Sequence, residues 1–226
     1  MATQVGNQQF VDEITREIIQ PGVERLMESR YFTDLRAGKL SVRQLGGFAI
    51  QHYIHNMAVL KGFALVAVQR AADDRAFMGM AGGLYEEFTH PNMCRKFGFA
   101  LGLTDEDFDH ALPAFGCLVH TAATIHAFYL GSPVEVRANA LANETMVQRY
   151  AEEFDEYLRK NYDVAEEGME FFVVHKGADI EHTARSAKAI AELADSDEDK
   201  ERVRLVCRNM ARFKLGKFDS IYEEYA

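Results

Sequence analysis

Apolar residues recur at the spacing of an α-helix along almost the whole of this 226-residue chain. Only four prolines interrupt the pattern, and no run of alternating apolar and polar residues is flanked by hairpin turns. The length allows one sizeable hydrophobic core, and no linker, repeat or low-complexity stretch divides the sequence. We therefore expect an all-α fold, a single domain over residues 1–226 with about seven to eight helices.

Capping residues indicate where several of these helices begin. Ser41 is a candidate N-cap. The strongest helix-start signal in the chain is at Ser132, which is followed by Pro133 and, at the third helical position, by Glu135. The expected ranges are 8–30 with a kink at Pro21, 41–60, 66–73, 75–88, a short helix after Thr104, 113–130, 133–160, 165–192 and 199–225.

Composition and charge exclude several classes of function. The net charge of −10, with no cluster of lysine and arginine among aromatic residues, argues against nucleic-acid binding. No apolar run approaches the ~18–20 residues of a membrane span, and the polar N-terminus does not resemble a signal peptide. Three scattered cysteines indicate a reduced, cytoplasmic protein rather than a disulfide framework.

Three residues in the run FFVVHKGADIEH form the clearest functional pattern. His175, Asp179 and His182 are spaced i, i+4, i+7, which brings them to one face of a helix. Two imidazoles and a carboxylate provide most of a first coordination shell for iron, manganese or zinc. Because each group is costly to bury alone, the three together predict a metal site.

Acidic residues on other helices are further candidates for the same site. Glu144 is the only charged residue in ANALANETMVQ, although it would also fit a salt bridge to Arg137 or Arg149. Glu86 and Glu87 end the predicted helix 75–88. Glu87 and the following His90 have the Glu-x-x-His spacing of bundle di-metal sites, but Pro91 makes the helical phase uncertain beyond residue 88.

The order E-E-x-x-x-P-N, an isolated glutamate and then H-x-x-x-D-x-x-H resembles the heme-oxygenase-like di-metal oxidases and oxygenases. Their superfamily includes TenA, the pyrroloquinoline-quinone maturation oxidase and the chlamydial protein associating with death domains. The resemblance implies a bundle around a central, water-poor pocket. It also implies the metal ligands Glu86, Glu144, His175, Asp179 and His182.

The chain departs from the family pattern at one ligand. The chlamydial protein has a histidine two residues after the proline, where this chain has Met93, and a thioether is a poor ligand for oxygen-activating iron. His90 is the candidate replacement. Pro91 disturbs the geometry that His90 would need as a ligand. We therefore expect the second metal ion to be labile, rather than held by His90 in full replacement of the missing ligand.

A second group of residues is expected to line a substrate pocket. Gln51, His52 and His55 lie in the stretch that lines the pocket in the superfamily, and Tyr150 is a weaker candidate. The alternative is that one of these two histidines lies in the hydrophobic core and the other lies on the surface, so that neither contacts a substrate. The cysteine nucleophile of the thiaminase-type members has no counterpart in this chain.

The resemblance implies a non-haem iron enzyme that uses two iron ions and O2 to oxidise a small molecule, such as an amino acid or a fatty acid derivative. One alternative is a cofactor-free oxidase in which His52, His55 and Tyr150 handle protons. Another is a non-enzymatic ligand-binding or regulatory protein with a relic metal site. The expected partner is the small-molecule substrate, with a homodimer as an open alternative to a monomer.

Overall fold

The computed structural model describes the backbone of residues 2–226, and the side chains of these residues apart from 2–6, 75 and 178–180. The described elements are α1 (Ala2–Ile14), α2 (Gln20–Met27), α3 (Arg30–Arg36), α4 (Val42–Gln69), α5 (Asp74–Glu87), α6 (His90–Ala100), α7 (Asp105–Asp109), α8 (Phe115–Leu130), α9 (Pro133–Asn161), α10 (Glu170–Leu193) and α11 (Asp197–Glu224). A π-helical turn, η1 (Thr15–Ile19), joins α1 to α2, and a 3-10 turn, η2 (Glu166–Met169), leads into α10. Over residues 2–226 no strand is present, so the predicted all-α fold is confirmed.

The predicted helix starts are confirmed where capping residues define them. Ser41 accepts a hydrogen bond from the Gln44 backbone at 3.1 Å, and the Gln44 side chain accepts one from the Ser41 backbone at 3.0 Å. The same reciprocal arrangement joins Ser132 and Glu135 at the start of α9. These pairs satisfy amide groups that the first helical turn leaves without partners.

One predicted boundary is wrong and another is confirmed. The expected helix 66–73 is the end of α4, which continues without a break from residue 42 to residue 69. The expected helix 75–88 corresponds to α5, which ends at Glu87, and after a turn the chain continues as α6 with Pro91 in its first turn. Proline is well suited to that position because an amide there has no helical partner to lose.

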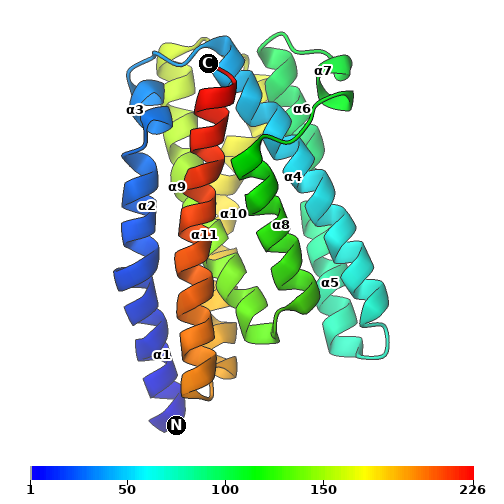
Figure 1. Ribbon diagram of the computed structural model, residues 1–226, viewed down its shortest axis with the longest axis vertical. Coiled ribbons are helices and arrows are strands. Elements are labelled where there is room, and N and C mark those ends of the chain that lie inside the picture. Colours follow the sequence, from blue (N-terminus) through cyan, green and yellow to red (C-terminus); the bar gives the residue numbers. More distant parts are fainter. Residues whose placement is uncertain (1) are drawn as a thin grey trace.

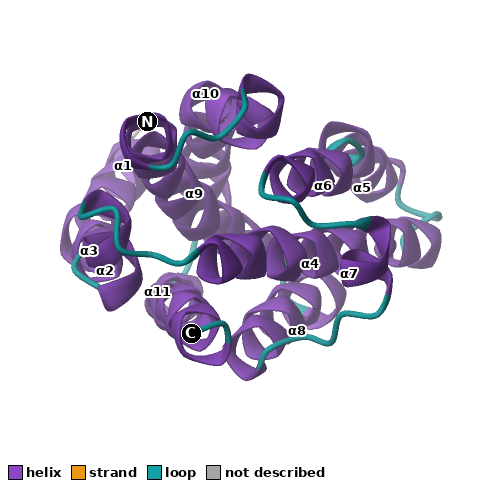
Figure 2. Ribbon diagram, turned by 90° about the horizontal axis from the view of Figure 1, so that it is seen from above, coloured by secondary structure: helices purple, strands orange, loops and turns teal. Residues whose placement is uncertain are grey.

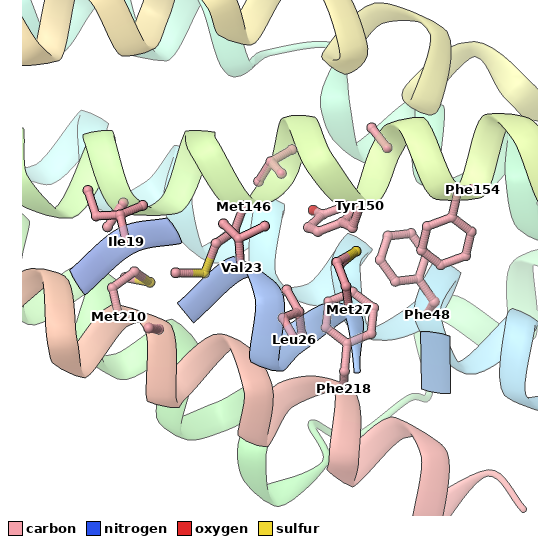
Figure 3. Packing of buried hydrophobic residues seen from close by; sticks show 14 of the residues in the cluster. Ile19, Val23, Leu26, Met27, Phe48, Met146, Tyr150, Phe154, Met210 and Phe218 are labelled. Atoms are coloured by element: carbon pink, nitrogen blue, oxygen red, sulfur yellow. The ribbon is translucent and has the colours of Figure 1, made fainter. Parts of the chain in front are cut away.

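The long helices surround α4, which lies near the centre of the bundle. In the view from above, α4 runs between α6 and α8, while α9 packs against α10 and α11 packs against α8 (Figures 1 and 2). The residues facing the interior are mostly aromatic and aliphatic, including Phe48 of α4, Tyr150 and Phe154 of α9 and Phe218 of α11 (Figure 3). None of the described helices combines the length and apolarity needed to cross a bilayer.

Two glycines show how closely α8 and α11 approach each other. A Cβ atom added to Gly116 of α8 would lie 2.0 Å from the backbone oxygen of Gly216 in α11, so the contact tolerates no side chain at residue 116. The Gly116 amide also donates to the Ser220 hydroxyl at 2.9 Å. A Cβ atom on Gly216 would point into open space.

These two glycines therefore predict opposite effects of the same substitution. Gly116→Ala should destabilise the fold by about 1–3 kcal/mol or more, because α8 must move away from α11. Gly216→Ala, the matched control, should stabilise it by up to about 1 kcal/mol, because alanine favours the helix interior. Urea unfolding followed by circular dichroism measures both, and equal effects would contradict the described contact.

Candidate metal and substrate site

A cavity of about 400 Å³ lies among α4, α5, α6, α8, α9, α10 and α11. This volume is suited to a small molecule. One part of its wall is apolar and includes Val59, Phe63 and Phe128. The ionisable residues on the wall are His52, His55, Glu86, Glu87, His90, Arg137, Glu144, His175, His182, Arg185 and Lys214.

The cavity brings together most of the predicted metal ligands. Glu86 from α5, Glu144 from α9 and the two histidines of α10, His175 and His182, all line it, as does His90 at the start of α6. The side chain of Asp179 lies outside the described residues. Five candidates separated by up to 96 residues in the chain thus share one cavity wall.

His175 is held in the form that a metal ion requires. Its Nδ1 donates a hydrogen bond to the backbone oxygen of Phe171 at 2.7 Å, so the proton lies on Nδ1 and Nε2 carries the lone pair. Burial, with the neighbouring His90, lowers the pKa of His175 to about 4. The ring is therefore neutral at neutral pH and available as a nitrogen ligand.

His90 lies directly beside His175, with ring centroids 4.5 Å apart. Its Nδ1 contacts a carboxylate oxygen of Glu87, three residues earlier at the end of α5. Burial acts to raise the pKa of Glu87, but the hydrogen bond and charge of His90 outweigh it and lower the pKa. Met93 instead packs in the hydrophobic core. A turn at residues 88–89 separates α5 from α6, as the expected loss of helical phase after residue 88 implies, and His90 at the start of α6 lies on the cavity wall.

Glu86 and His182 form a second acid–histidine group. The carboxylate of Glu86 lies 3.9 Å from Nε2 of His182. Both oxygens of Glu86 also accept hydrogen bonds from Arg185, at 3.0 and 2.9 Å. Arg185 thus orients the Glu86 carboxylate toward α10, in the manner of a second layer of residues around a metal site.

Glu144 lies on the cavity wall, and one of its two alternative partners is engaged elsewhere. Arg149 pairs with Glu153 and with Glu152, both on α9. Arg137, the other alternative, is itself a residue of the cavity wall. The position of Glu144 therefore fits a role at the cavity better than the predicted salt bridge to Arg149.

Two of the four predicted pocket residues line the cavity, and two do not. His52 and His55 are on its wall, and burial lowers the pKa of both well below the usual value. Gln51 instead ties α4 to the loop before α8, donating to the Leu112 backbone at 2.9 Å. Tyr150 lies in the aromatic core between α3 and α11.

Sequence reasoning missed two lysines of α11. Lys214 and Lys217 are fully buried, and Lys214 lines the cavity. They occupy core positions of a helical repeat whose other members are Val203, Cys207, Met210 and Ile221. A lysine at two successive positions of such an apolar repeat is the signal that could have identified them.

The donor chemistry of this wall fits iron. Imidazole nitrogens and carboxylate oxygens suit a non-haem iron site, and His175 already has its second nitrogen tied to a carbonyl group. Among the described side chains, no three of the histidine, cysteine, aspartate or glutamate type already converge on one coordination centre. The groups Glu87–His90 and Glu86–His182 therefore each supply part of a ligand set, and neither forms a complete coordination shell among the described side chains.

Comparison with known proteins places this chain in a family. The chain is 26% identical to a 4-aminobenzoate synthase of Chlamydia trachomatis over 221 residues, covering 95% of this chain and 92% of that protein. It is 28% identical to a 4-aminobenzoate synthase of Nitrosomonas europaea over 242 residues, covering 100% of this chain and 94% of that one.

Solved structures share the fold at low sequence identity. A domain of unknown function with a heme oxygenase-like fold from Shewanella denitrificans matches with a TM-score of 0.80 and 19% identity, covering 92% of this chain and 90% of the other. A TenA homologue from P. horikoshii matches with a TM-score of 0.75 and 19% identity, covering 94% and 98%. The family model of iron-containing redox enzymes matches residues 47–216. The chain thus has a heme-oxygenase-like fold and belongs to the family of iron-containing redox enzymes, and it is an oxidoreductase.

Proposed function

We propose that this chain is a non-haem iron oxidase or oxygenase that uses O2 to oxidise a small molecule bound in the cavity. The observation that carries the proposal is the pair of buried histidines His90 and His175, whose ring centroids lie 4.5 Å apart on the wall of a small cavity. The relatives named 4-aminobenzoate synthase make a small aromatic acid one candidate product.

Two iron ions would be held by two groups of residues. His90, Glu87 and His175 form the first group, and Glu86 and His182 the second, with Glu144 and Asp179 as further carboxylates. Iron bound there would supply electrons to O2. Carboxylates offset the positive charge of the metal, and neutral imidazoles complete the set without adding charge.

The surrounding residues prepare the ligands and keep water away. Phe171 fixes the proton of His175 on Nδ1, Glu87 orients His90, and Arg185 orients Glu86. Val59, Phe63 and Phe128 give the cavity an apolar wall, which limits the water around a bound substrate. Each of these contacts fixes a ligand before metal binds, which reduces the reorganisation that binding requires.

The cofactor-free alternative has less support from the geometry. It needs His52, His55 and Tyr150 to act together on a substrate. Tyr150 lies in the aromatic core next to Phe32 and Phe218 rather than on the cavity wall. Activity that requires added Fe(II) would separate the two functions, because a cofactor-free oxidase consumes O2 equally well after metal has been removed.

Removing His175 should strongly reduce iron binding while leaving the fold intact. His175→Ala should lower the iron content after anaerobic Fe(II) loading to less than about half, because the prepared nitrogen ligand is lost. The matched control is His110→Ala, which removes an exposed histidine outside the cavity. Metal analysis with circular dichroism tests this, and iron content equal to wild type in His175→Ala would contradict the proposal.

His90 and Met93 should have separate roles. His90→Ala should lose roughly one equivalent of iron, because it removes a nitrogen ligand. Met93→Ala should keep its iron but lose about 2–5 kcal/mol of stability, because a buried side chain is truncated. Anaerobic Fe(II) titration with urea unfolding distinguishes the two effects. If wild type holds one tight and one weak iron and Met93→His tightens the weak one, His90 does not replace the family ligand.

A further inference from the structure

Asn139 of α9 differs from the other asparagines on the cavity wall. The side chain of Asn56 donates a hydrogen bond to Sγ of Cys94 at 3.5 Å. The side-chain oxygen of Asn143 accepts one from Lys214 at 2.5 Å. The amide of Asn139 forms no hydrogen bond with any other residue in the described part of the chain. Both of its polar atoms therefore remain available to a ligand.

Asn139 is nevertheless almost completely buried. Its side chain lines the cavity, and the residue is only 5% exposed. In folded proteins, nearly all buried amide groups have a hydrogen-bond partner, because an unpaired one has lost its bonds to water. Since the protein supplies none, the partner of this amide must come from the cavity itself.

The chemistry of the asparagine amide limits what that partner can be. Its carbonyl oxygen accepts hydrogen bonds, and its NH2 group donates them. A carboxylate can only accept and would leave the carbonyl oxygen unpaired, whereas an ammonium group can only donate. A hydroxyl group carries both functions on one atom and aligns with only one end of the amide. A carboxamide presents a donor and an acceptor side by side, so it can form two hydrogen bonds with the asparagine.

The position of Asn139 along α9 shows where the rest of such a ligand would lie. Val136, one turn earlier, belongs to an apolar cluster with Phe63 and Phe128, whose rings stack with centroids 4.6 Å apart. Glu144 follows five residues after Asn139, about 7–8 Å further along the helix axis. The free amide is therefore located between an apolar part of the cavity wall and the proposed metal ligands.

We propose that the cavity binds a small carboxamide, whose amide group pairs with the side chain of Asn139 while its apolar body packs against Phe63 and Phe128. Asn139 is a binding residue for this ligand, and the two hydrogen bonds require no iron. The proposal rests on the proposed function only in taking the bound carboxamide to be the molecule that is oxidised.

Benzamide is a suitable probe because it combines a carboxamide with a small apolar ring. Acetophenone has nearly the same shape, but a methyl group replaces the NH2 group, so it can only accept hydrogen bonds. Benzoate is charged and also only accepts, and benzyl alcohol carries a hydroxyl group. Calorimetric titration of the Fe(II)-loaded protein without O2 should show that benzamide binds more tightly than the other three.

Asn139→Leu removes the donor and the acceptor while keeping the size of the side chain. Benzamide affinity should fall about tenfold, the loss expected when a pair of neutral hydrogen bonds is removed. Acetophenone affinity should change by less than about threefold, so the variant should lose the preference for benzamide. The matched control Asn209→Leu changes a partly exposed asparagine of α11 outside the cavity and should leave both affinities unchanged.

Thermal unfolding of the ligand-free protein distinguishes a binding role from a structural one. Asn139→Leu should unfold at a temperature no lower than that of wild type, because replacing an unpaired buried amide by an apolar group of similar size does not destabilise the fold. An asparagine that holds two helices together would instead lower the unfolding temperature when it is replaced.

His175→Ala separates this proposal from the proposed function. Its iron content should fall, but its benzamide affinity should stay within about threefold of wild type, because the hydrogen bonds to Asn139 do not involve iron. Iron content therefore tests the metal site, and benzamide affinity tests the carboxamide contact.

Four results would overturn the proposal. The first is equal benzamide affinity in wild type and Asn139→Leu, and the second is tighter binding of acetophenone, benzoate or benzyl alcohol than of benzamide to wild type. The third is a clearly lower unfolding temperature of Asn139→Leu, which would show that the amide is structural. The fourth is the absence of benzamide binding to folded wild-type protein at millimolar concentrations.

Discussion

Several ionisable side chains of the cavity wall, among them His52, His90, His175 and Lys214, are buried within a largely aromatic helical bundle and must be stabilised there. The polar partners come from the helices themselves: a backbone oxygen of α10 for His175, Arg185 of the same helix for Glu86, and Asn143 of α9 for Lys214. For the buried His175 and Lys214, the contact replaces hydrogen bonds to water that burial removes. The packing of α4, α9, α10 and α11 and the chemistry of the cavity are thus coupled.

The cavity wall carries ionisable groups of both signs. Carboxylates and histidines from α5, α6, α9 and α10 line it together with His52 of α4 and Lys214 of α11. A metal ion held there would offset the negative charge of the carboxylates.

Much of the fold and part of the site could be predicted from the sequence, because local rules decide them. Ser41 and Ser132 start helices through hydrogen bonds within one turn. His175 and His182 share a helix face through their spacing alone, and the structure places both on the cavity. Such features depend on residues at most seven positions apart.

The remaining features depend on tertiary contacts that no local pattern contains. Pro91 made the helical phase uncertain after residue 88, and the position of His90 on the cavity wall depends on where α6 packs against α4, which no local pattern contains. Tyr150 was a pocket candidate, but it packs against aromatic rings of α3, α4 and α11. Lys214 and Lys217 lie in a charged C-terminal segment, where a lysine is usually exposed.

The central claim is that His90 and His175 belong to one iron site on the cavity wall. The most direct measurement is anomalous diffraction at the iron absorption edge from a crystal of the protein loaded with Fe(II) in the absence of O2. The account predicts anomalous density in the cavity beside both histidines, with a second peak beside Glu86 and His182. Iron density only outside the cavity, or a cavity that remains empty in crystals with saturating Fe(II), would contradict it.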